Sequence, residues 1–119
     1  SMKDWAATAA AVHGLTIEQV RAGCPAAAVA AGTDHFSGFI VVSDNPRWDQ
    51  RWLDRLRTGR PRIEVLGLRE IARSRLSGPA ADMLAMTLLR SASTHHAAED
   101  AARLAVAWRA ALSVQELAA

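Results

Sequence analysis

A histidine pair and an aspartate at the start of an alanine-rich run are the residues best suited to chemistry in this chain. The stretch from Ser93 to Leu104 reads Ser-Thr-His-His-Ala-Ala-Glu-Asp-Ala-Ala-Arg-Leu. Residues four apart share a helix face, so we expect Asp100 to align with Leu104, Trp108 and Leu112. Burying an unpaired carboxylate is costly. A metal ion is one partner that would make this position favourable.

An earlier segment repeats the combination of a carboxylate with an apolar helix face. Pro46 follows an apolar run and permits a helix over residues 47–57. Asp49 shares a face of that helix with Leu53 and Leu56, so a second carboxylate lies on the apolar side. Another face carries the arginines Arg47, Arg51 and Arg55. Such a stripe suits phosphate groups and, equally, a solvated surface.

Each of these residues also has a structural interpretation. Asp49 and Asp100 both fall near a helix start, where the helix dipole favours negative charge. Trp48 and Trp52 are more typical of a core than of a platform for bases, although base stacking would suit a single-stranded partner. His13 lies in a turn, where a hydrogen bond to the backbone is its more common role.

Length and composition indicate one globular domain over residues 1–119. Half of the residues are hydrophobic and 22% are charged, which argues against intrinsic disorder. No apolar run approaches the length of a membrane span and no signal-peptide pattern is present, so we expect a cytoplasmic protein with no membrane partner. The single Cys24 excludes an internal disulfide and a cysteine-built zinc site.

Positive charge is concentrated in the middle of the chain. The net charge is only +2, yet nine of the 14 basic residues lie between residues 47 and 75, against four acidic ones. This excess favours a polyanionic partner, or it forms a solvated arginine-rich surface.

Glycine, proline and capping signals divide the chain into short elements. Thr16 to Gln19 has a capping-box pattern, which predicts a short helix to Arg21. The apolar run 39–42 predicts a buried strand, interior to a sheet with helices on both faces. The other predictions are helices over residues 25–31, 47–57, 68–75, 79–90 and 97–112, a weaker strand over 62–66, and a frayed tail over 114–119.

Alternation of strands and helices in the second half of the chain predicts an α/β fold. One good strand and one weak strand make too small a sheet to cover residues 39–42 on both sides. We therefore expect further residues, or another subunit, to complete the sheet.

Three segments together resemble a known enzyme family. His13-Gly14-Leu15-Thr16 is similar to the His-Gly-Ile-Thr segment that precedes the second motif of the DEDDh 3′–5′ exonucleases, the group that includes the DnaQ proofreading subunits and RNase T. Asn45 to Asp49, followed by Trp52-Leu53, is similar to the second motif itself. His95 to Asp100 is similar to the third motif, His-x4-Asp. The order and spacing of the three segments also fit, over most of the chain.

This resemblance implies an RNase H-like fold, a mixed sheet flanked by helices, in which a carboxylate cluster holds two Mg²⁺ or Mn²⁺ ions. Asp49 and Asp100 would be metal ligands and His95 the catalytic base. The implied activity is hydrolysis of phosphodiester bonds at single-stranded or 3′ nucleic-acid ends. The residues expected to contact nucleic acid are Asn45, Arg47, Trp48 and Arg51. RNase T-like relatives are homodimers, which makes a homodimer an expectation by analogy.

The sequence departs from the family in its first motif. An Asp-x-Glu strand should supply further carboxylates before His13, where Asp4 stands alone. Asp44 replaces a frequent histidine, and Val65 to Leu68 replaces a frequent Asp-Thr segment. Three interpretations follow: the C-terminal two-thirds of an exonuclease domain, catalytically incomplete as it stands; a degenerate relative that binds nucleic acid or protein without cutting; and a mainly helical interaction domain with an accidental match.

Overall fold

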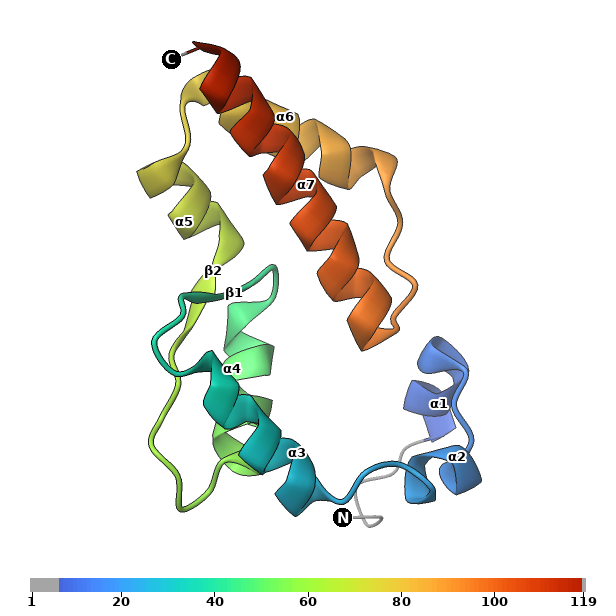
Figure 1. The fold of residues 1–119 in the computed structure, drawn as a ribbon. Helices are drawn as coiled ribbons and strands as arrows, with labels where there is room; N and C mark the ends of the chain where they lie inside the picture. Colours follow the sequence, from blue (N-terminus) through green and yellow to red (C-terminus); the bar gives the residue numbers. More distant parts are fainter. Residues whose placement is uncertain (1–6, 119) are drawn as a thin grey trace. The chain divides into compact units, whose positions relative to one another are not determined.

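The chain folds as a mixed α/β protein that is mostly helical, with one small parallel sheet (Figure 1). The structure is a computed structural model, and it describes residues 7–118. The chain divides into two compact units. We call residues 24–75 the sheet unit, and the described residues 7–23 with 76–118 the helical unit.

The sheet unit places a two-stranded parallel sheet beside short helices. Its elements are α3 (Ala26–Gly32), the 3-10 helix η2 (Thr33–Phe36), β1 (Val41–Ser43), α4 (Pro46–Leu56), β2 (Val65–Gly67) and α5 (Leu68–Arg75). Val41 pairs with Val65 and Ser43 with Gly67. The connection between the parallel strands includes α4, as a parallel crossover requires.

A glutamine side chain fixes α4 against β2. Gln50 donates a hydrogen bond to the Ile63 carbonyl (2.9 Å) and accepts one from the Val65 amide (2.7 Å). In a larger sheet, the same carbonyl and amide would form hydrogen bonds with a further strand beside β2. Ile63 and Val65 are buried, so the amide of Gln50 satisfies polar groups at the edge of the apolar core.

A buried arginine, Arg57, lies at the carboxyl end of α4. Arg57 is 3% exposed and its guanidinium binds Asp34 at 2.7 Å, the Thr33 hydroxyl at 2.7 Å and the Pro61 carbonyl at 2.9 Å. Arg60 binds the second oxygen of Asp34 at 2.5 Å. Several partners are needed because a buried guanidinium without them would be strongly unfavourable.

The helical unit is built around a pair of long helices. Its elements are α1 (Ala7–His13), α2 (Ile17–Arg21), α6 (Gly78–Arg90) and α7 (Ala97–Ala118), of which α6 and α7 pack together. Ala80, Ala107 and Ala111 are fully buried, and such small side chains permit close helix approach. Within residues 7–118, no helix is long and apolar enough to cross a membrane.

Most predicted elements are confirmed near their predicted ends. The helix predicted over 68–75 is α5, and the capping box forms with Thr16 and Gln19 exchanging hydrogen bonds of 2.8 and 3.1 Å. The predicted fraying after residue 113 is wrong, because α7 continues to Ala118. One cause is Gln115, which accepts a hydrogen bond from the Ser77 amide at the start of α6.

The prediction of a strand buried on both faces is wrong. Phe39 is 75% exposed and Ile40 is 53% exposed, and β1 begins only at Val41. The sheet within the described chain has two parallel strands and is not a larger mixed sheet. Too few strands are therefore present to cover the apolar run.

Candidate functional site

Asp49 lies in the first turn of α4, directly after the carboxyl end of β1. Its side chain is exposed and accepts a hydrogen bond from the Ser43 hydroxyl. That hydroxyl accepts a hydrogen bond from the Asn45 amide at 2.8 Å. The Asn45 carbonyl in turn accepts the amides of Trp48 and Asp49, both at 3.2 Å. The carboxylate is thus held at the strand end by polar contacts.

The outward face of α4 carries alternating tryptophans and arginines. Trp48 is 51% exposed and Trp52 is 49% exposed, so the interpretation of both as core residues is wrong. The Arg51 guanidinium lies 5.5 Å from the Trp48 ring centre, and that of Arg55 lies 5.3 Å from the Trp52 ring centre. Both distances are within the range of cation–π interactions. Arg47 is exposed near the start of the same helix.

Asp100 organises the loop that precedes α7. Its carboxylate accepts the Ser93 hydroxyl at 2.9 Å and the Thr94 amide at 3.0 Å. The Ser93 hydrogen bond, with smaller contributions from Thr94 and from the charges of His95 and Arg103, lowers the pKa of Asp100 below its ordinary value. Asp100 is half-buried, and its partners are a hydroxyl and an amide.

The apolar face of α7 differs from the one expected. Ala107 and Ala111 are its buried positions, whereas Leu104 and Trp108 are half-buried and Leu112 is 38% exposed. Leu104, Trp108 and Leu112, which follow Asp100 at intervals of four residues, therefore lie beside the buried face of α7 and not at its centre. Packing of small alanines against α6 selects the buried side of the helix.

His95 has an unusual backbone conformation. Its φ angle is +60°, in the left-handed region that residues with a side chain rarely adopt. Its amide donates to the Ser93 hydroxyl at 3.2 Å, and the same hydroxyl binds Asp100. Ser93 and Asp100 together hold the histidine in its place before the helix. Sequence reasoning missed this role of Ser93, although a serine hydroxyl that accepts the amide two residues further on is a recognised local pattern.

The candidate metal ligands belong to different parts of the chain. Asp49 is in the sheet unit, and Asp100 with His95 is in the helical unit. Among the described residues, no group of three or more His, Cys, Asp or Glu side chains is arranged to hold a metal ion. Carboxylate oxygens suit Mg²⁺ or Mn²⁺ chemically, but the donors found here are too few for a complete site.

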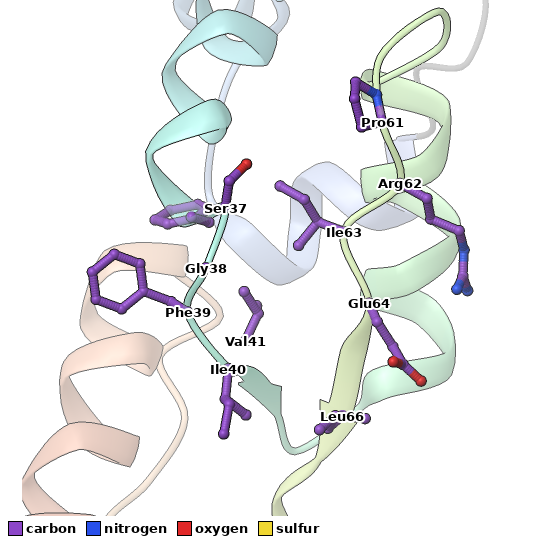
Figure 2. A pocket seen from close by; sticks show the side chains of 11 residues that line it. Ser37, Gly38, Phe39, Ile40, Val41, Pro61, Arg62, Ile63, Glu64 and Leu66 are labelled. Atoms are coloured by element: carbon purple, nitrogen blue, oxygen red, sulfur yellow. The ribbon is translucent and has the colours of Figure 1, made fainter.

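A separate apolar hollow lies at the amino ends of the two strands. It has a volume of about 330 Å³ and opens between residues 36–41 and 61–66 (Figure 2). The side chains of Val41 and Ile63 lie between the two segments, whereas Arg62 and Glu64 point to the outer side of the second segment. Because β1 and β2 are parallel, the hollow and Asp49 lie toward opposite ends of the sheet.

Comparison of the chain with known protein families, with curated proteins and with solved structures finds no match.

Proposed function

We propose that this chain belongs to a metal-dependent 3′–5′ exonuclease of DEDDh type, with an RNase H-like fold, that acts on nucleic-acid 3′ ends. The observation that carries the proposal is the position of Asp49 at the carboxyl end of a parallel strand, next to the exposed face of α4. In open α/β sheets, ligands bind beyond the carboxyl ends of the strands. The Asn45–Asp49 segment therefore occupies the edge where substrate is expected.

The proposal gives each candidate residue a distinct task. Asp49 and Asp100 would contribute carboxylate oxygens for Mg²⁺ or Mn²⁺, and further carboxylates, such as those of an Asp-x-Glu strand, would have to join them. His95 would accept the proton of the attacking water, a task that imidazole performs well near neutral pH. Ser93 already places His95 and Asp100 in one hydrogen-bonded loop. Asn45, Arg47, Trp48 and Arg51 would contact the substrate strand.

Hydrolysis of a 5′-labelled single strand by the full-length protein tests this proposal. We expect Mn²⁺-dependent shortening from the 3′ end, abolished by a chelator. His95→Ala should lower the rate about 100-fold or more, the usual contribution of a positioned base, and Asp100→Asn should also inactivate. Asp82→Asn, an exposed aspartate on α6, is the matched control and should retain the wild-type rate. Equal rates for Asp100→Asn and wild type would remove Asp100 from the proposed site.

A second candidate is a domain that binds nucleic acid without cutting it. The small number of metal donors within residues 7–118 favours this alternative. It predicts binding to single strands with no Mn²⁺-dependent hydrolysis. The coding sequence upstream of Ser1 provides an independent test, because an Asp-x-Glu strand there would support the enzyme.

A further inference from the structure

The outward face of α4 carries a repeat that the sequence pattern alone did not pair residue by residue. Trp48 with Arg51, and Trp52 with Arg55, form two successive pairs of the same kind, each with a guanidinium on an indole ring. We infer that each Trp–Arg pair binds one unpaired nucleotide, so that α4 holds a short single-stranded segment. The inference rests on the proposed function for the nature of the partner, and it adds Trp52 and Arg55 as binding residues.

The exposure of the two tryptophans is the first argument. A half-exposed indole leaves a large apolar surface in water, and adjacent exposed aromatic side chains commonly mark an interaction site. The inward side of the same helix is already packed, through Gln50, the half-buried Leu53 and the buried Arg57 that follows it. The tryptophans are thus turned away from the contacts that hold α4 in the sheet unit.

Charge indicates the chemistry of the partner. In the sheet unit, Asp34 is bound by Arg57 and Arg60, and Asp54 lies 3.6 Å from Arg62. No ion pair is found for Arg47 or Arg51 within residues 7–118. Their positive charges therefore remain available to a polyanion, and arginine is well suited to phosphate because its donors are planar and always charged.

Geometry favours unpaired bases over a duplex. Trp48 and Trp52 are four residues apart, so a rise of about 6 Å along the helix axis separates them. This distance is close to two steps of a stacked strand, whose rise is about 3.4 Å per nucleotide. Only unpaired bases expose the ring faces on which indoles stack, whereas a duplex presents base edges in its grooves. Stacking of this kind tolerates any base sequence.

Binding of labelled oligothymidylate, about 12 nucleotides long, by the full-length protein tests the inference. Fluorescence anisotropy is measured in a chelator, so that hydrolysis does not contribute. We expect Trp48→Leu and Trp52→Leu each to weaken binding about 5- to 100-fold, and Trp48→Phe to restore most of it, because stacking requires an aromatic ring. A duplex of the same length should bind more weakly than the single strand.

Arginine variants provide a second measurement. Arg51→Gln should reduce the slope of log affinity against log salt by about 0.7, the value for one phosphate contact in single strands. Arg69→Gln, an exposed arginine on α5 in the same unit, is the matched control and should leave the slope unchanged. Leu89→Ala, which removes an exposed side chain of α6, controls for a general loss of apolar surface.

The outcomes separate this inference from the proposed function. Wild-type affinity in Trp48→Leu and Trp52→Leu overturns the inference, even if Mn²⁺-dependent hydrolysis is found. Stacking-dependent binding without any hydrolysis supports the inference and contradicts the exonuclease. Concentration-dependent self-association that Trp48→Leu abolishes, with no affinity for oligothymidylate, would instead identify a protein partner and also overturn it.

Discussion

Within residues 7–118, His95 is the one residue other than glycine that has a positive φ angle. The left-handed conformation at φ +60° costs a residue with a Cβ about 1–2 kcal/mol, a cost that glycine does not incur. Such conformations persist where neighbouring groups enforce them, and they concentrate at functional sites. Here the enforcing groups are Ser93 and Asp100, which hold the loop from both sides of the histidine.

Replacement of His95 by glycine tests this strain. We expect His95→Gly to be more stable than wild type by about 0.5–1 kcal/mol, because relief of the left-handed conformation exceeds the added entropy of the unfolded chain. Urea denaturation measures the difference, with His96→Gly as the matched control, expected to be no more stable than wild type. A less stable His95→Gly variant would show that the imidazole itself stabilises the loop.

The carboxylate of Asp34 leads to a prediction about the pH dependence of stability. The hydrogen bond from Arg57, aided by the charge of Arg60, lowers the pKa of Asp34 below its ordinary value. The ionised form is favoured in the folded state, so the contribution of Asp34 to stability is complete above the unfolded pKa of about 3.9. It is lost as the pH falls below that value and through the lower folded pKa.

We therefore expect acid to destabilise the wild-type protein more steeply than Asp34→Asn. Denaturation followed by tryptophan fluorescence, repeated from about pH 5 downward, measures the two slopes. Asp44→Asn, an exposed aspartate beside β1, serves as the control. Parallel curves for wild type and Asp34→Asn would contradict the assigned ion pairs.

At the scale of elements, α4 connects the sheet to the proposed binding face. Its inward side is fixed by Gln50 to the backbone of residues 63–65, and its outward side carries the Trp–Arg pairs. The glutamine thereby sets the rotation of the helix about its axis. Any function of the outward face depends on this inward contact.

Gln50→Leu should test that dependence. The substitution keeps the volume but leaves the Ile63 carbonyl and the Val65 amide without their partners, which should destabilise the sheet unit by about 1–3 kcal/mol. Thermal or urea denaturation gives the value. Gln19→Leu, which removes only the exposed capping contact of α2, should cost less.

At the scale of the whole molecule, the division into two compact units predicts separable stability. Arg57→Ala removes the buried guanidinium and leaves the Thr33 hydroxyl, the Asp34 carboxylate and the Pro61 carbonyl without this donor. We expect a loss of about 1–3 kcal/mol that is confined to the sheet unit. Native-state hydrogen exchange should show faster exchange in α4 and β2. The amides of α6 and α7 should be unaffected, and a uniform increase would instead indicate one cooperative unit.

Local signals in the sequence determined much of the secondary structure. The capping box of α2, the proline that begins α4 and the limits of α5 follow from residues within a few positions of each other. Capping and turn preferences act over short distances, so they survive in almost any tertiary context. The resemblance to exonucleases likewise depends on local motifs, and the roles it implies remain predictions.

Only the tertiary structure decided which side chains are covered. Phe39 and Ile40 have the pattern of a buried strand, and Trp48 and Trp52 have that of a core, yet all four are half-exposed or more in the described chain. Burial depends on partners distant in sequence, which a periodic pattern does not identify. The hydrogen bonds between Ser93 and Asp100, and between Gln50 and the backbone of Ile63 and Val65, likewise depend on how the folded chain brings these residues together. The sequence thus determined where the helices α2, α4 and α5 form. Packing of the inward side of α4 determined that its Trp–Arg pairs face the solvent.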